Sequence, residues 1–163
     1  MSKDTIEKSA VMPAPLERVW HSVSDARKFG EWFGVEFDGP FREGQRATGR
    51  IRPTRVDPEV AKLQEPHAGK PFEFVVDAIE PHRRIAFRWH PFAIEPGKDY
   101  SHEPMTRIEF RFEEVDKGTR VTITESGFEA IPAGRRDAAY AANEGGWEHQ
   151  LKLLRRYVDV PGG

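Results

Sequence analysis

The strongest constraint on the fold is a strict alternation of apolar and charged residues between positions 107 and 114. In the stretch RIEFRFEE, Ile108, Phe110 and Phe112 point one way, and the charged residues between them point the other way. This period of two is typical of an antiparallel strand with one buried face and one wet face. The turn VDKGT follows, with Gly118 at its tip, and RVTITES returns as the second strand of a hairpin.

Other segments show weaker strand patterns. Residues 5–12 predict a first strand, and residues 72–79 and 85–92 predict two strands in the middle of the chain. The stretches VEFDGPF and RATGRIR predict two shorter strands. Residues 53–71 contain four prolines, which favours a long exposed connection of the kind that borders a binding site or forms a mobile flap.

Helical spacing occurs at both ends of the chain. Leu16, Val19, Trp20 and Val23 follow at steps of three and four, and FGEWF repeats that spacing after a capping residue at position 24 or 25. Residues 132–158 predict a long helix. Its expected buried stripe consists of Tyr140, Glu144, Trp147, Leu151, Leu154 and Val158.

Composition narrows the class of protein. The chain has 163 residues, 37% hydrophobic residues and a net charge of −2, which suits a single globular domain over residues 1–163. The mixed charge argues against nucleic-acid binding, and no stretch is apolar enough for membrane insertion. The first ten residues contain no signal-peptide core, so we expect a cytoplasmic protein.

The order of these elements predicts an α+β fold. A strand is followed by two short helices, several antiparallel strands and one long helix, so the helices would gather on one face of an antiparallel sheet. A long helix that crosses a curved sheet leaves a space between them unless large side chains fill it.

Four groups of residues resemble one known family. They are APLERVWHSVSDARKFGEWFG, then WHPF and DYSHEP, then ITESGFEAIP, and last NEGGWEHQLKLLRRY. They are similar to the family named after the activator of the ninety-kilodalton heat-shock-protein ATPase, within the START-like or SRPBCC superfamily. The resemblance covers about residues 5–157 and implies the helix-grip fold of the birch-pollen allergen, in which a curved sheet wraps around a long C-terminal helix.

The resemblance also implies a hydrophobic cavity between sheet and helix that binds a small apolar or aromatic ligand. Aromatic-rich concave sites with few polar groups hold such molecules. The residues expected to line the cavity are Trp32, Phe33, Phe41, Ile51, Phe74, Trp89, Phe110, Asn143, Gly146 and Trp147. Each aromatic residue could instead fill the core, and polar groups at Arg50, Arg88, Asn143 and His149 could orient the ligand.

Two adjacent glycines lie inside the expected long helix, in the stretch ANEGGW. Each glycine costs a helix interior about 1 kcal/mol relative to alanine. Gly145 and Gly146 therefore suggest that a strand, a loop or a ligand comes close to the helix beside Trp147. Tight packing of helix on sheet, without a ligand, would explain them equally well.

The sequence gives little support for catalysis or cofactors. The six histidines are scattered, cysteine is absent and neither a metal motif nor a nucleotide-binding loop occurs, so we expect no metal and no cofactor. Glu125 or Glu144 could act as an acid or base, but the TESGF stretch is not a nucleophile elbow.

Three functions stay open. The first is a module that binds a small apolar ligand without chemistry of its own. The second is an enzyme of cyclase, aromatase or hydrolase type that acts on a polyketide-like substrate. The third is a partner of a chaperone ATPase, as the family name suggests.

Overall fold

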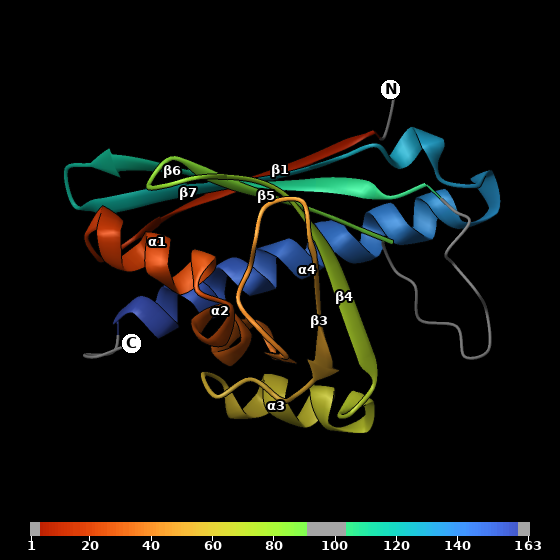
Figure 1. Cartoon of the computed structure of the whole chain (residues 1–163), viewed down its shortest axis with the longest axis horizontal. Coiled ribbons are helices and arrows are strands. Elements are labelled where there is room, and N and C mark those ends of the chain that lie inside the picture. The colour runs from red at the N-terminus through yellow and green to blue at the C-terminus, as the bar shows by residue number, and fades with distance from the viewer. Residues whose placement is uncertain (1–3, 91–103, 160–163) are drawn as a thin grey trace.

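The framework of the fold is a curved antiparallel sheet (Figure 1). The computed structural model describes residues 4–90 and 104–159. Within these residues, seven strands are paired in the order β1-β7-β6-β5-β4-β3-β2, and every pair is antiparallel. The strands are β1 (Thr5–Met12), β2 (Val35–Phe37), β3 (Arg46–Ile51), β4 (Pro71–Glu80), β5 (Arg84–Trp89), β6 (Thr106–Val115) and β7 (Gly118–Ser126).

The long helix α4 crosses one face of this sheet, and the two short N-terminal helices lie on the same side (Figure 1). The helical elements are α1 (Leu16–Ser24), α2 (Ala26–Phe33), α3 (Pro58–Gln64), the 3-10 turns Glu65–His67 and Phe128–Ala130, and α4 (Ala133–Asp159). Asp25 caps α2 by accepting hydrogen bonds from the backbone N–H groups of Arg27 and Lys28. The α+β helix-grip architecture expected from the sequence is confirmed.

The hairpin of β6 and β7 has the register that the alternation predicts. Phe110 pairs with Ile123, and Val115 pairs with Gly118 at the turn. Gly118 adopts a φ of 146°, and a Cβ there would lie 2.0 Å from the carbonyl oxygen of Met12, so only glycine fits. Ile108, Phe110 and Phe112 are buried as expected.

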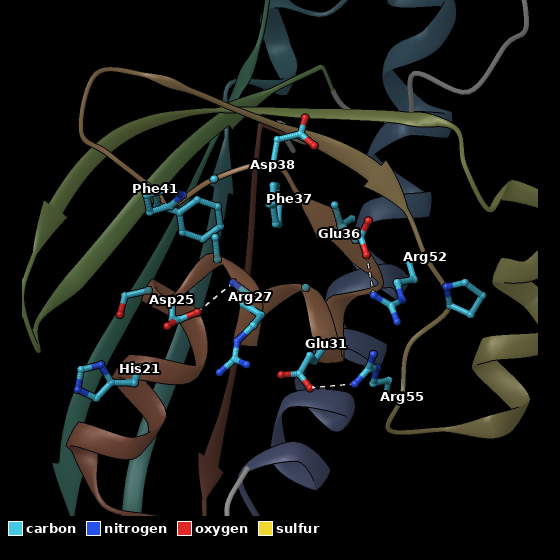
Figure 2. A pocket seen from close by; sticks show the side chains of 17 residues that line it. His21, Asp25, Arg27, Glu31, Glu36, Phe37, Asp38, Phe41, Arg52 and Arg55 are labelled. Carbon is cyan, nitrogen blue, oxygen red and sulfur yellow. Dashed lines mark hydrogen bonds and ion pairs between the residues drawn. The ribbon is translucent and has the colours of Figure 1, made fainter.

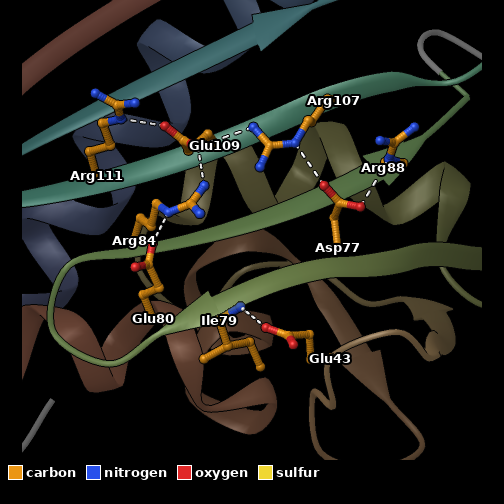
Figure 3. A network of polar contacts seen from close by, with 9 residues as sticks. All are labelled: Glu43, Asp77, Ile79, Glu80, Arg84, Arg88, Arg107, Glu109 and Arg111. Atoms are coloured by element: carbon orange, nitrogen blue, oxygen red, sulfur yellow. Dashed lines mark hydrogen bonds and ion pairs between the residues drawn. The ribbon is translucent and has the colours of Figure 1, made fainter.

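The other face of the sheet is less exposed to solvent than expected, because Glu109 is buried among arginines (Figure 3). Its carboxylate accepts hydrogen bonds from Arg84 at 2.9 Å, from Arg107 at 3.0 Å and from Arg111. Arg107 continues the chain of contacts to Asp77 at 2.7 Å. We name this set of charged residues on β4, β5 and β6 the arginine network. It consists of Asp77, Glu80, Arg84, Arg88, Arg107, Glu109 and Arg111.

The long exposed connection expected over residues 53–71 contains a helix that the sequence did not predict. Helix α3 occupies its centre and begins at an Asp-Pro cap, where the Asp57 carboxylate accepts from the N–H groups of Glu59 and Val60. A short 3-10 turn follows. No residue of α3 is fully buried, so the helix lacks the apolar stripe that would have revealed it in the sequence.

The expected stripe of α4 is nearly right, with one error. Trp147, Leu151, Leu154 and Val158 are buried, whereas Glu144 is exposed to solvent. The neighbouring Asn143 takes the inward position instead, since its side chain bonds to the sheet.

Candidate functional site

The residues expected to line a cavity come together between the sheet and the helices. They are supplied by α2 (Trp32, Phe33), the segment after β2 (Phe41), β3 (Ile51), β4 (Phe74), β5 (Trp89), β6 (Phe110) and α4 (Asn143, Gly146, Trp147). Ile51, Trp89, Asn143 and Gly146 are partly exposed, and the others are buried. The fold therefore gathers these side chains, although they lie far apart in the sequence.

The centre of this group is packed with aromatic rings. Phe29 on α2 lies 4.8 Å, centroid to centroid, from both Trp32 and Phe33, and 5.8 Å from Phe74. Phe74 in turn stacks on Phe87 at 4.6 Å. Because these rings contact one another directly, this part of the predicted lining forms the hydrophobic core.

Four rings at the border of this core form what we name the aromatic rim: Phe33, Phe72, Trp89 and Trp147. Successive centroids lie 5.8 Å, 6.0 Å, 5.7 Å and 6.1 Å apart around the set. Phe72 and Trp89 are only partly buried. Sequence reasoning missed Phe72, although the alternation in FEFVVDAI places it on the same face of β4 as Phe74.

Glu125 on β7 lies directly behind the rim and has no exposed surface. One carboxylate oxygen accepts from the indole N–H of Trp147 at 2.7 Å, and the other accepts from the indole N–H of Trp89 at 2.8 Å. The second oxygen also accepts from the Thr106 hydroxyl at 2.5 Å. The Asn143 amide donates to both oxygens, at 3.0 Å and 3.1 Å.

These contacts decide what Glu125 can do. An indole N–H donates and cannot accept, so the site requires a carboxylate that only accepts. Each oxygen already holds at least two donors, which leaves no free position for a substrate proton. Glu125 is therefore better suited to act as a fixed anchor that orients the two indoles than to act as a general base.

The structure answers the question of the two helical glycines only in part. Apart from the chain neighbours and the backbone of α4 itself, no described atom lies within 4 Å of the Cβ that alanine would place at Gly145 or Gly146. The expectation that a strand or loop packs closely against them is therefore wrong for the described residues. Gly145 is exposed, whereas Gly146, which precedes Trp147 in α4, is partly buried, and the position that its Cβ would take is open.

The remaining polar candidates lie away from this region. Arg50 and His149 are exposed, with the Arg50 guanidinium 3.8 Å from Asp38. Arg88 bonds to Asp77 in the arginine network. Of the polar residues suggested to orient a ligand, Asn143 reaches the rim, through Glu125.

A separate hollow of about 770 Å³ lies between α1, α2 and the hairpin of β2 and β3 (Figure 2). Phe41 is the one predicted lining residue on its wall. Ion pairs join Glu36 to Arg52 at 2.7 Å and Glu31 to Arg55 at 3.7 Å. This mixed-charge groove differs in chemistry from the apolar site that the sequence predicts.

Two classes of feature are missing from residues 4–90 and 104–159. No three histidine, aspartate or glutamate side chains in these ranges are grouped so as to hold a metal ion. None of the helices in these ranges combines the length and the hydrophobicity needed to cross a bilayer.

Comparison with solved structures places the fold among known proteins. A protein from the dynemicin biosynthetic locus, DynU16, superposes with a TM-score of 0.67 at 22% identity, over 96% of this chain and 48% of that chain. Proteins from Arthrobacter aurescens and Staphylococcus epidermidis both superpose with a TM-score of 0.70, at 18% and 20% identity. They cover 98% of this chain, and 88% and 92% of their own chains. At these identities the likeness shows the fold.

Sequence comparison identifies the family. A search of curated protein sequences gives no match. The family model described as activator of Hsp90 ATPase homolog 1-like protein matches residues 13–159. Because this match covers most of its length, the chain belongs to the family of activator of Hsp90 ATPase homolog 1-like proteins.

Proposed function

We propose that this protein binds a small apolar or aromatic molecule at the aromatic rim, beside Gly146 of α4. The observation that carries the proposal is the rim itself. Two of its four rings, Phe72 and Trp89, stay partly exposed at the border of a packed core, and the fourth ring, Trp147, follows Gly146 in α4, where the position of a Cβ is open. Aromatic walls with few polar groups are the usual setting for such ligands.

The hydrogen bonds behind the rim support this function. Glu125 fixes the orientation of both indoles before any ligand arrives. A site that is already ordered loses less conformational freedom on binding, which favours affinity. The location of one structural neighbour in a biosynthetic locus is consistent with the handling of a small organic molecule.

The experiment compares leucine at the two adjacent glycines. Both changes replace a helical glycine by the same good helix former, so they share the same gain in helix propensity. We expect Gly146→Leu to fill the space next to the rim and weaken binding of N-phenyl-1-naphthylamine at least tenfold. Gly145→Leu, on the exposed side of α4, serves as the matched control and should bind like the unchanged protein.

Fluorescence titration of the probe measures the three affinities, and circular dichroism confirms that each variant is folded. Equal binding by both leucine variants would place the probe elsewhere and refute the proposed site. Absence of saturable binding to the unchanged protein would refute the function for aromatic ligands of this size.

Fewer structural features support the other two functions, a partner of a chaperone ATPase and an enzyme. A client-binding surface of a chaperone partner would need a contiguous apolar patch. Among the described residues the exposed large apolar side chains are Val11 on β1 and Leu63 on α3, on separate elements. For an enzyme, Glu125 is fully occupied by donors and Glu144 faces solvent.

A further inference from the structure

We propose that the mixed-charge groove (Figure 2) is a second binding site, which takes a small organic anion with one carboxylate and an aromatic body. The inference goes beyond binding at the aromatic rim, because none of the four rim rings lines this groove. The groove lies between α1, α2 and the hairpin of β2 and β3, and its volume of about 770 Å³ suits a small molecule.

Two ion pairs hold most of the charge on the groove wall. Glu31 lies 3.7 Å from Arg55 and accepts a hydrogen bond from the Tyr157 hydroxyl at 3.2 Å. Glu36 accepts a hydrogen bond from Arg52 at 2.7 Å. Each of these two arginines is therefore already engaged by a carboxylate of the protein.

The other two carboxylates of the lining also have partners. Asp25 caps the N-terminus of α2 through two backbone N–H groups. Asp38 accepts a hydrogen bond from the Thr48 hydroxyl at 3.3 Å and lies 3.8 Å from the Arg50 guanidinium. All four carboxylates that line the groove are thus held by groups within the chain.

Arg27 is the exception among the arginines of the groove. Its guanidinium makes no hydrogen bond and no ion pair with any residue in the described ranges, and in Figure 2 the dashed line at Arg27 ends at its backbone N–H. A guanidinium matches the planar geometry of a carboxylate and can bind it through two parallel hydrogen bonds. A ligand carboxylate could therefore bind Arg27 without displacing a contact that the protein makes itself.

An aromatic surface lies close to Arg27. Gly30 follows three residues later, on the same face of α2. A Cβ at Gly30 would lie 3.8 Å from the Phe37 ring, and that ring packs edge-on against Phe41 with the centroids 5.0 Å apart. Because Phe37 is only partly buried and lines the groove, it offers an apolar surface to a ligand whose carboxylate reaches Arg27.

The surrounding charges limit the ligand to one negative charge. A single carboxylate balances the one arginine of the lining that lacks a partner. A dianion such as a phosphate monoester would carry its second charge into a groove lined by four carboxylates, which disfavours it. A neutral ligand would gain nothing from the charge of Arg27.

A pair of probes that differ in charge tests this inference. 2-Naphthoate and 2-naphthamide share the same rings, but only the first carries a carboxylate. Isothermal titration calorimetry should show that the unchanged protein binds 2-naphthoate about fivefold to tenfold more tightly, as one charge-assisted pair at an exposed site would give.

Two variants assign the preference to a residue. Arg27→Met keeps the apolar stem of the side chain and removes the guanidinium, so the preference should disappear. Lys28→Met is the matched control, because Lys28 also lies in the first turn of α2 but does not line the groove. The two variants change the interaction with the helix dipole alike, so Lys28→Met should keep the preference.

Several outcomes would overturn the proposed site. These are absence of binding by either probe, equal affinity of the two probes for the unchanged protein, and a preference that survives Arg27→Met. An equal loss in Lys28→Met would trace the preference to the positive charge of the helix end rather than to the groove. Loss of 2-naphthoate binding in Gly146→Leu, with binding kept in Arg27→Met, would place the probe at the rim. The neutral N-phenyl-1-naphthylamine reports on the rim separately, so either proposal can fail without the other.

Discussion

Glycine has opposite roles at two helical positions of this protein. A Cβ at Gly30 in α2 would lie 1.9 Å from the carbonyl oxygen of Val35, so the chain turns back so closely that only glycine fits. A Cβ at Gly145 in α4 would have no described atom within 4 Å apart from its chain neighbours and the helix backbone. The first glycine is required by packing, whereas the second only weakens its helix.

Alanine substitutions should therefore change stability in opposite directions. We expect Gly145→Ala to raise the free energy of unfolding by about 1 kcal/mol, from helix propensity alone. Gly30→Ala should lower it by about 2 kcal/mol or more, since Val35 or α2 must move. Urea unfolding of both variants measures the changes. A loss of stability in Gly145→Ala would show that close packing, rather than open space, explains that glycine.

The sequence located part of the candidate site at the level of single residues. Trp89, Asn143 and Trp147 were expected near a ligand, and the structure brings all three to Glu125. The period of two in RVTITES puts Glu125 on the same face as Val121 and Ile123, and this signal in the sequence points to a buried carboxylate that the sequence analysis did not identify.

The packing of Phe29 against the predicted lining is not visible in the sequence, because spacing shows which residues face inward but not how tightly their rings meet.

At the scale of the elements, Glu125 fastens α4 to the sheet. Its partners come from β5, β6 and α4, so one side chain of β7 links three other elements. A second link joins α4 to α2, where the Tyr157 hydroxyl donates to Glu31 at 3.2 Å.

Replacement of this anchor should loosen the contact between α4 and the sheet. In Glu125→Gln the new amide group would face indole and amide N–H groups that also donate, so buried donors lose their acceptor. We expect a loss of about 2 kcal/mol in the free energy of unfolding. Thr106→Val removes one donor and leaves the others in place, so it should cost less in the same urea titration. Equal losses in the two variants would contradict the anchoring role.

The elements themselves were predictable where an apolar pattern marks them. The β6–β7 hairpin, α1, α2 and α4 have strong periodic signals, and the structure confirms each of them. Helix α3 has no fully buried residue, so the Asp57-Pro58 cap was its main signal, and the four prolines around it favoured a loop.

At the scale of the whole molecule, the sheet has one face for packing and one face held by charge. Burial raises the pKa of Glu109, but hydrogen bonds from Arg111, Arg107 and Arg84 outweigh this, and its pKa lies below the usual value. The hydrogen bond from Arg107 likewise lowers the pKa of Asp77. Carboxylates whose pKa falls on folding stabilise a protein above their unfolded pKa values, near 4.

The arginine network should therefore contribute less to the free energy of unfolding at acid pH. We expect Glu109→Gln to lower the free energy of unfolding by about 2 kcal/mol at pH 7, because three arginines lose a shared partner. As the pH falls below the unfolded pKa, the unfolded state binds the proton before the native carboxylate does, so the difference should shrink progressively until the lowered native pKa is passed. Urea unfolding at pH 7 and pH 3 provides the comparison, with the exposed Glu113→Gln as control. A difference that stays constant with pH would exclude the ionised network as the cause.

The hydrogen bonds behind the rim also give the protein a built-in optical reporter. Two of its four tryptophans, Trp89 and Trp147, donate to the same buried carboxylate, so their emission depends on one local environment at the junction of β5, β7 and α4. Separation of α4 from the sheet breaks the hydrogen bond of Trp147 and removes the Trp147 ring from the neighbouring Trp89 ring, so the surroundings of both indoles change together. Intrinsic fluorescence can thus follow this junction in real time, without a label or an added dye.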